Sequence, residues 1–235
     1  MKTHEIRTII DKTLGIDRKP APEPLNEAYV ALPKTYDMPT EMLSEKTKKA
    51  HFELYEGYVR KLNDTSAKLD TAERKGLLAG TNDYRSLKLD ETHNLNAVWL
   101  HELYFANMSD VHSEVFSDSL AFMRLERDFG GGGFEGWQWD MIACAMSAQS
   151  GWAVTGYHMF LQRYINTFID GHDCHVPVGL YPVIVLDCWE HASRDVYNDR
   201  ELYIKSMMTE IRWSIVDERF KKAERIAEAL GGPPR

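Results

Sequence analysis

The chain has 235 residues, of which 43% are hydrophobic and 27% are charged, an ordinary globular composition that can bury a substantial core. The formal net charge of -8 argues against a general nucleic-acid binder, because phosphate contacts need clustered lysine and arginine. We expect no membrane-spanning helix, since no apolar run approaches the roughly 20 residues that a span needs.

The cysteines and the first residues bear on the compartment. The three cysteines, Cys144, Cys174 and Cys188, are scattered and odd in number, so they indicate neither a disulfide framework nor a CxxC metal site. The opening MKTHEIRTIIDKTLGIDRK lacks the long apolar core of a signal peptide and is expected to be a short amphipathic segment or a loose extension. These features predict a cytoplasmic protein in a reducing compartment.

The N-terminal half has a helical pattern. Residues 19–46 are rich in proline and predict an extended lead-in. The next segment, LSEKTKKAHFELYEGYVRKLNDTSAKL, predicts a helix with Ser44 as its N-cap. After a linker with Gly76 and Gly80, DETHNLNAVWLHELYFANM predicts a second helix. Its apolar face is expected to consist of Leu95, Val98, Trp99 and Leu103.

The C-terminal half mixes helices and strands. GGGG, at 130–133, is the strongest break, with one predicted helix before it (SDSLAFMRLERDF) and one after it (FEGWQWDMIACAMSAQS). From Trp152 onwards, GWAVTGYHMF, RYINTFI and LYPVIVL are short, rich in β-branched and aromatic residues, and bounded by turns, which predicts strands. One long helix, ELYIKSMMTEIRWSIVDERFKKAERIAEAL, is predicted to follow.

This order of elements predicts an α+β fold, in which an N-terminal helical hairpin precedes an α/β domain with a small antiparallel sheet. We expect an N-terminal extension over 1–24 and a helical hairpin domain over 25–116. The α/β domain, over 117–235, is expected to contain a three-stranded antiparallel sheet and the C-terminal helix.

The heptapeptide LDCWEHA, 186–192, places ionisable groups directly after an apolar run. Asp187 and His191 are four residues apart, so they would lie on one helical face and could share a metal ion if the chain turns into helix there. An aspartate at a strand end is also a common helix N-cap, so the pair alone is ambiguous. His51 and His101 are further candidates, because each lies among apolar residues of a predicted helix.

VLDCWEHA resembles the D-x-W-E-H-A signature of iron/manganese superoxide dismutases. AVWLHELYFANMS resembles that family's second helix, SAQSGWAV its helix-to-sheet transition, and LSEKTKKAHFELYEGYVRKLN its first helix. The order and spacing agree over residues 25–222. The resemblance implies dismutation of superoxide to O2 and H2O2 by a metal that alternates between M(III) and M(II).

The resemblance also implies a site. One Fe or Mn ion per subunit would be bound by His51, His101, Asp187 and His191. Trp152 and Trp189 would wall the metal with apolar surface, and Glu190 would reach across a subunit interface to hold a metal histidine of the partner. This implies a homodimer. The sequence leaves open whether the metal is iron or manganese and whether dimers pair into tetramers.

The first helix departs from the family pattern. The family has eight residues from the metal histidine to the active-site tyrosine, whereas His51 and Tyr58 are seven apart. The downstream register would select Ala50 as the ligand, but alanine cannot bind a metal. One deleted residue rotates the downstream part of a helix by about 100°, so we expect a bulge or a repositioned Tyr58. Tyr58 is the first candidate for the substrate-gating tyrosine, and Tyr55 is the alternative.

The hydrogen bond to the metal-bound solvent also differs. The family usually supplies a glutamine, either from the second helix, where this chain has Ala97, or from the sheet hairpin, where it has His172. Similar members also have histidine in the hairpin, so His172 is the outer-sphere candidate, and a solvent-facing turn histidine is the alternative. His93 lies eight residues before His101, about 80° around the helix, and is expected to miss the metal.

Two other functions compete with dismutation. The family's gateway histidine on the first helix has no match here, so a non-catalytic or regulatory metal-binding protein on the same fold is the main alternative. A non-haem iron oxygenase with two histidines and a carboxylate is the other, and a third histidine in ligand context argues against it.

Overall fold

The computed structural model describes residues 3–15, 28–40, 42–72, 74, 83–108, 113–193 and 199–231. The helices are α1 (Thr3–Thr13), α2 (Glu45–Asp70), α3 (Asp83–Asn107), α4 (Leu120–Asp128), the 3-10 helix η1 (Gly130–Gly132), α5 (Gly133–Ser147), α6 (Glu190–Ser193), α7 (Arg200–Thr209) and α8 (Trp213–Ala229). The strands are β1 (Gly151–His158), β2 (Arg163–Asp170) and β3 (Leu180–Asp187). This is the predicted α+β fold. Within the described ranges, no helix has both the length and the apolarity needed to cross a membrane.

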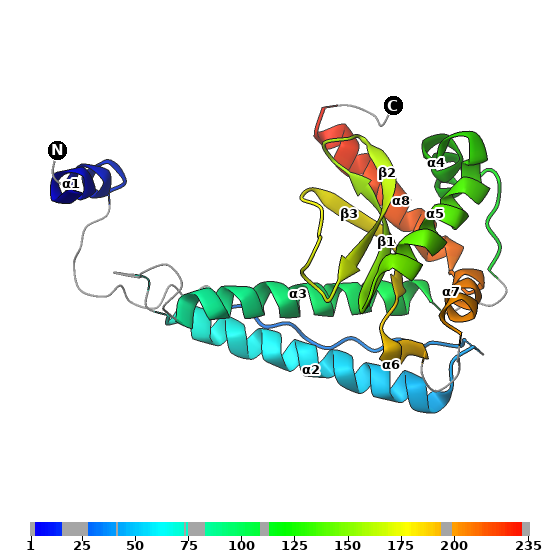
Figure 1. Cartoon of the computed structure of the whole chain (residues 1–235), viewed down its shortest axis with the longest axis horizontal. Helices are drawn as coiled ribbons and strands as arrows, with labels where there is room; N and C mark the ends of the chain where they lie inside the picture. Colours follow the sequence, from blue (N-terminus) through cyan, green and yellow to red (C-terminus); the bar gives the residue numbers. More distant parts are fainter. Residues whose placement is uncertain are drawn as a thin grey trace.

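Helices α2 and α3 are long and lie side by side as a hairpin, and the sheet with its covering helices stands on α3 (Figure 1). The predicted N-cap of α2 is confirmed, since Ser44 Oγ accepts a hydrogen bond from the backbone N–H of Thr47 at 3.1 Å. The whole of α2 is α-helical, so it contains no bulge.

The predicted apolar face of α3 is partly wrong. Leu95 and Trp99 are 47% and 44% exposed, and the helix begins seven residues earlier than DETHNLN suggests, at Asp83. The side of α3 that packs against α2 and β3 is centred on His101, and Leu95 and Trp99 lie off that side. The buried residues of α3 are Asn94, Ala97, Val98, Leu100, His101, Tyr104, Phe105 and Asn107.

Residues 28–40, here called the strap, have no regular secondary structure, which confirms the extended lead-in for this part. The strap is held to α2 by side chains that satisfy its backbone. Ser66 Oγ accepts from the N–H of Tyr29 at 2.8 Å, and the amide of Asn63 both accepts from and donates to the backbone of Ala31, at 2.7 and 2.9 Å.

The sheet is three-stranded and antiparallel, as predicted, and its strand order is β2-β1-β3. The register pairs Trp152 with both Ile169 and Asp187, so these three side chains share one face of the sheet. The strands need glycine where β1 begins, because a Cβ on Gly151 would lie 1.9 Å from the carbonyl oxygen of Ile169. Helices α5 and α8 contact the sheet as well.

The prediction of a single closing helix is wrong. The helix ends at Thr209 and α8 begins at Trp213. Between them, Ile211 forms a β-bridge with Met108, and the N–H of Arg212 donates to the carbonyl of Asn107 at 2.9 Å. Hydrogen bonds to the end of α3 thus replace helical ones, which periodicity along the sequence does not reveal.

The amphipathic segment at the N-terminus is the helix α1, which lies apart from the other elements in Figure 1. Its isoleucines Ile6, Ile9 and Ile10 are exposed along one side. The domain boundaries proposed from the sequence stay a prediction.

Candidate metal centre

Three of the four predicted ligands meet in the core. His51 from α2, His101 from α3 and Asp187 from the end of β3 are buried, and one possible ligand atom of each lies within 4.8 Å of the others. His51 Nε2 lies 3.0 Å from Asp187 Oδ2, and the two imidazole rings are 5.2 Å apart. We call His51, His101 and Asp187 the metal group.

The protonation of His101 follows from its contacts. Its Nδ1 lies 2.6 Å from the carbonyl oxygen of Ala97, and a carbonyl can only accept, so Nδ1 carries the proton and Nε2 has a lone pair. Burial, and then the nearby His51, lower the pKa of His101 from 6.5 to about 3. The imidazole is therefore neutral at neutral pH, as metal binding requires.

Asp187 is oriented by the start of the next turn. Its Oδ1 accepts a hydrogen bond from the N–H of Trp189 at 2.8 Å, while its Oδ2 is the atom near His51. The hydroxyl of Tyr203 donates to the backbone oxygen of Asp187 at 3.0 Å and fixes the chain there. The N-cap alternative therefore accounts for Oδ1 alone, and Oδ2 stays directed at the metal group.

The metal group fits a metal ion. Imidazole nitrogens with a carboxylate oxygen are a donor set of first-row transition metals. His101 Nε2 is buried and makes no hydrogen bond within the part of the chain that the structure describes. Such an atom costs about 1–3 kcal/mol of folding free energy unless something binds it. A cation held between these donors removes that cost.

The remaining predicted residues of this motif lie in α6 or directly before it. The backbone of His191 belongs to α6, but its side chain lies outside the described residues, so its role as a ligand stays a prediction. Glu190 is exposed at the start of α6. The indole of Trp189 stacks on His172, with ring centroids 5.3 Å apart.

The structure brings Tyr58 and His172 together beside the metal group. His172 is fully buried, and its Nε2 lies 3.0 Å from the Tyr58 hydroxyl. Trp152 Nε1 donates to His172 Nδ1 at 3.0 Å. An indole N–H can only donate, so Nδ1 accepts, and in the neutral imidazole Nε2–H donates to Tyr58 Oη. We call Tyr58 and His172 the outer pair.

The seven-residue spacing on α2 explains how Tyr58 reaches this position without a bulge. On an unbroken α-helix, seven residues turn the chain by about 700°, so His51 and Tyr58 lie on almost the same side. The Tyr58 ring is 5.4 Å from the His101 ring. Burial, and then Asp187, raise the pKa of Tyr58, so its phenol stays protonated at neutral pH.

Tyr55, the alternative gating tyrosine, faces the strap instead. Its buried hydroxyl donates to Glu102 Oε1 at 2.9 Å and accepts from the N–H of Lys34 at 3.0 Å. Burial is the main reason that the pKa of Tyr55 rises to about 12. Its ring is 6.3 Å from that of His101, so the Tyr55 ring packs near the metal group. The hydroxyl instead forms its hydrogen bond with the strap.

Two residues of α3 contact His172, and the sequence predicted neither contact. His93 stays outside the metal group, as expected, but its ring lies 4.8 Å from that of His172. Asn96 Nδ2 donates to the backbone oxygen of His172 at 2.8 Å. Their spacing indicates only a shared helical face, because the contact depends on where the turn after β2 meets α3.

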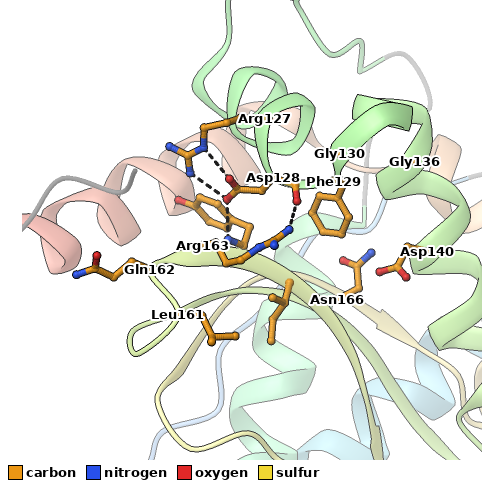
Figure 2. Close-up of a pocket in the computed structure, with 12 residues that line it drawn as sticks. Arg127, Asp128, Phe129, Gly130, Gly136, Asp140, Leu161, Gln162, Arg163 and Asn166 are labelled. Atoms are coloured by element: carbon orange, nitrogen blue, oxygen red, sulfur yellow. Dashed lines mark hydrogen bonds and ion pairs between the residues drawn. The ribbon is translucent and has the colours of Figure 1, made fainter.

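A separate cleft of about 970 Å³ lies between α4, α5 and β2 and shares no lining residue with the metal group (Figure 2). Its two arginines are both engaged by one residue. Arg127 pairs with the Asp128 carboxylate at 2.6 Å, and Arg163 donates to the backbone oxygen of Asp128. The Arg163 contact joins β2 to the end of α4, whereas the Arg127–Asp128 pair lies within α4, and we assign no ligand to the cleft.

The C-terminal half matches a known family. Residues 119–219 match the family described as iron/manganese superoxide dismutases, C-terminal domain.

Relatives extend the similarity over most of the chain. A protein named Superoxide dismutase [Fe], from Aquifex pyrophilus, is 36% identical over 195 residues, which cover 81% of this chain and 90% of the relative. Superoxide dismutase [Mn] 1 from Halobacterium salinarum is 32% identical over 194 residues, covering 82% of this chain and 94% of that protein. Superoxide dismutase [Fe] from Cupriavidus metallidurans is 33% identical over 187 residues, covering 78% and 91%. With the buried metal group at its centre, the chain belongs to the iron/manganese superoxide dismutase family.

Proposed function

We propose that this protein converts superoxide to O2 and H2O2, using one Fe or Mn ion per subunit held by His51, His101, Asp187 and His191. The observation that carries the proposal is the convergence of the buried metal group with a hydrogen-bonded tyrosine–histidine pair beside it. A bound iron or manganese ion supplies one-electron chemistry by alternating between M(III) and M(II).

Large aromatic side chains pack around the metal group and exclude solvent from it. Trp152 is fully buried and its ring lies 4.8 Å from the His101 ring, while Trp189 covers the His172 side. Apolar walls strengthen the electrostatic interactions between the donors and a bound cation. Asp187 is the one carboxylate of the metal group, and its negative charge stabilises the M(III) state relative to M(II).

The outer pair handles protons. Formation of H2O2 from superoxide consumes protons, so the site needs a donor within reach. His172 Nε2–H donates to Tyr58 Oη, which directs the phenolic O–H of Tyr58 towards another acceptor. Tyr58 can therefore give its proton to a reduced substrate and accept another, with His172 holding its oxygen in place.

Glu190 supports the proposal of a homodimer or a tetramer of such dimers. It is exposed and lies three residues after Asp187, so it can reach another subunit while staying close to the metal group. We further propose a cytoplasmic location, supported by three cysteines that form no disulfide.

Metal analysis and superoxide turnover test the function on protein loaded separately with iron and with manganese. We expect stoichiometric metal and turnover in at least one form, and loss of both in His191→Ala. His158→Ala, which changes a partly buried histidine outside the metal group, is the matched control and should behave as wild type. Stoichiometric metal without turnover in both forms would contradict dismutation and favour the non-catalytic alternative.

A further inference from the structure

His93, a residue of α3, covers the outer pair. Its ring meets the His172 ring edge-on at 4.8 Å and lies 6.2 Å from the Tyr58 ring. The His93 side chain is 40% exposed, whereas His172 is fully buried. His93 therefore packs against His172, near Tyr58, with part of its own side chain open to solvent.

The turn that carries His172 makes two polar contacts with α3. His93 Nδ1 lies 3.4 Å from Asp173 Oδ1, and Asn96 Nδ2 donates to the backbone oxygen of His172 at 2.8 Å. His93 and Asn96 are three residues apart, so they project from one side of the helix. The orientation of the His172 ring thus depends on α3 as well as on Trp152.

We propose that His93, held by Asp173, is a positioning residue: it keeps His172 Nε2–H directed at Tyr58 Oη and keeps bulk water away from that hydrogen bond. Proton transfer needs heavy-atom distances of about 2.6–3.2 Å, so a small rotation of the His172 ring interrupts it. The effect on turnover rests on the proposed function, whereas the effect on the hydrogen bond does not.

The variants separate positioning from simple packing. His93→Leu removes the contact with Asp173 and keeps the side-chain size, while His93→Gln restores a polar group to meet Asp173. The matched control is His175→Asn. His175 lies on the same turn and makes an equivalent contact with Asp170 at 3.3 Å, with no ring contact to the outer pair in the described part of the chain. Asparagine suits its positive φ of 63°.

The first measurement does not depend on turnover. Proton NMR of the full chain carrying diamagnetic Zn²⁺ follows the exchange with solvent of the His172 Nε2 proton, assigned by its loss in His172→Gln. We expect exchange at least tenfold faster in His93→Leu, close to wild type in His93→Gln, and unchanged in His175→Asn. Exchange within twofold of wild type in His93→Leu, or equally fast in His175→Asn, overturns the inference.

The second measurement is steady-state turnover per bound metal. Loss of an outer-shell partner typically costs 10–100-fold, so we expect kcat to fall about tenfold in His93→Leu, while kcat/KM changes less than twofold. A purely structural role would instead lower metal content and Tm and leave kcat per metal unchanged. If His93→Leu does not fold, Asp173→Ala, which removes the oxygen that meets His93 Nδ1, gives the same comparison. Fast exchange together with an inactive wild type would refute the proposed function and leave the positioning role intact.

Discussion

The metal group and the outer pair adjoin each other but are built in different ways. The metal group takes its residues from two long helices and a strand end, all buried. In the outer pair, a half-buried tyrosine on α2 meets a histidine on a turn, held by Trp152 and by α3. We infer that metal retention depends on the buried core, whereas proton transfer depends on a few contacts that single substitutions can remove.

The largest effect is expected from breaking the metal group. His101→Gln replaces a buried imidazole whose Nε2 has no hydrogen bond within the described residues. Metal affinity should fall by more than about 100-fold and turnover should disappear with it, since even outer-shell losses cost 10–100-fold. Competition with a chelator measures the affinity, and retention of wild-type affinity would show that His101 is not a ligand.

Acid should act on the same group. In the folded metal-free protein the pKa of His101 is lowered from 6.5 to about 3. Between these two pH values His101 is therefore protonated in the unfolded chain and neutral in the folded one. This contribution to stability is complete above pH 6.5 and is lost as the pH falls towards 3. Urea unfolding of the metal-free protein should show a steeper decline over that window in wild type than in His101→Gln. Parallel declines would contradict the assignment.

Trp152→Phe should sharpen the contrast by affecting turnover without removing metal. It deletes the N–H that fixes the tautomer of His172, and we expect turnover per metal to fall about tenfold. Trp137→Phe is the matched control, because it also deletes a buried indole donor, here to Thr155 Oγ1 at 2.8 Å, but outside the site. Equal turnover in the two variants would show that the tautomer does not matter.

The smallest effect is expected at Tyr55. Tyr55→Phe removes the hydrogen bonds to Glu102 and to the strap, which should lower the free energy of unfolding by about 1 kcal/mol. Turnover should stay within twofold of wild type, because the hydroxyl faces away from the outer pair. Urea denaturation and turnover assays check both, and a large loss of turnover would restore Tyr55 as a gating candidate.

The fold was predictable where local patterns decide it. The order of helices, the three strands and the N-cap at Ser44 all follow from periodicity and turn residues. The break before Trp213 was missed because the end of α3 supplies the competing hydrogen bonds. The exposure of Trp99 was missed because α3 packs against two partners at once.

The site shows the same division. The motif that contains Asp187, and the histidines within apolar helices, predict the metal group, because polar residues among apolar ones stand out in the sequence. Their role as ligands stays a prediction. The proximity of His93 to His172 leaves none, since 79 residues separate them and only the tertiary structure brings the turn onto α3. The orientation of Tyr55 depends in the same way on the strap.

The register of the sheet has a consequence for how the chain tolerates changes in length. Trp152 pairs directly with Asp187, so the residue that holds His172 and a residue of the metal group occupy one row of the sheet. The register already shifts once between Thr155 and Gly156, so an insertion on the Trp152 side of that irregularity would turn one of them to the opposite face. Residues 159–162 connect β1 to β2 at the far end of the hairpin, so added or lost residues there leave this row in place. Length variation at this tip is therefore compatible with an intact site.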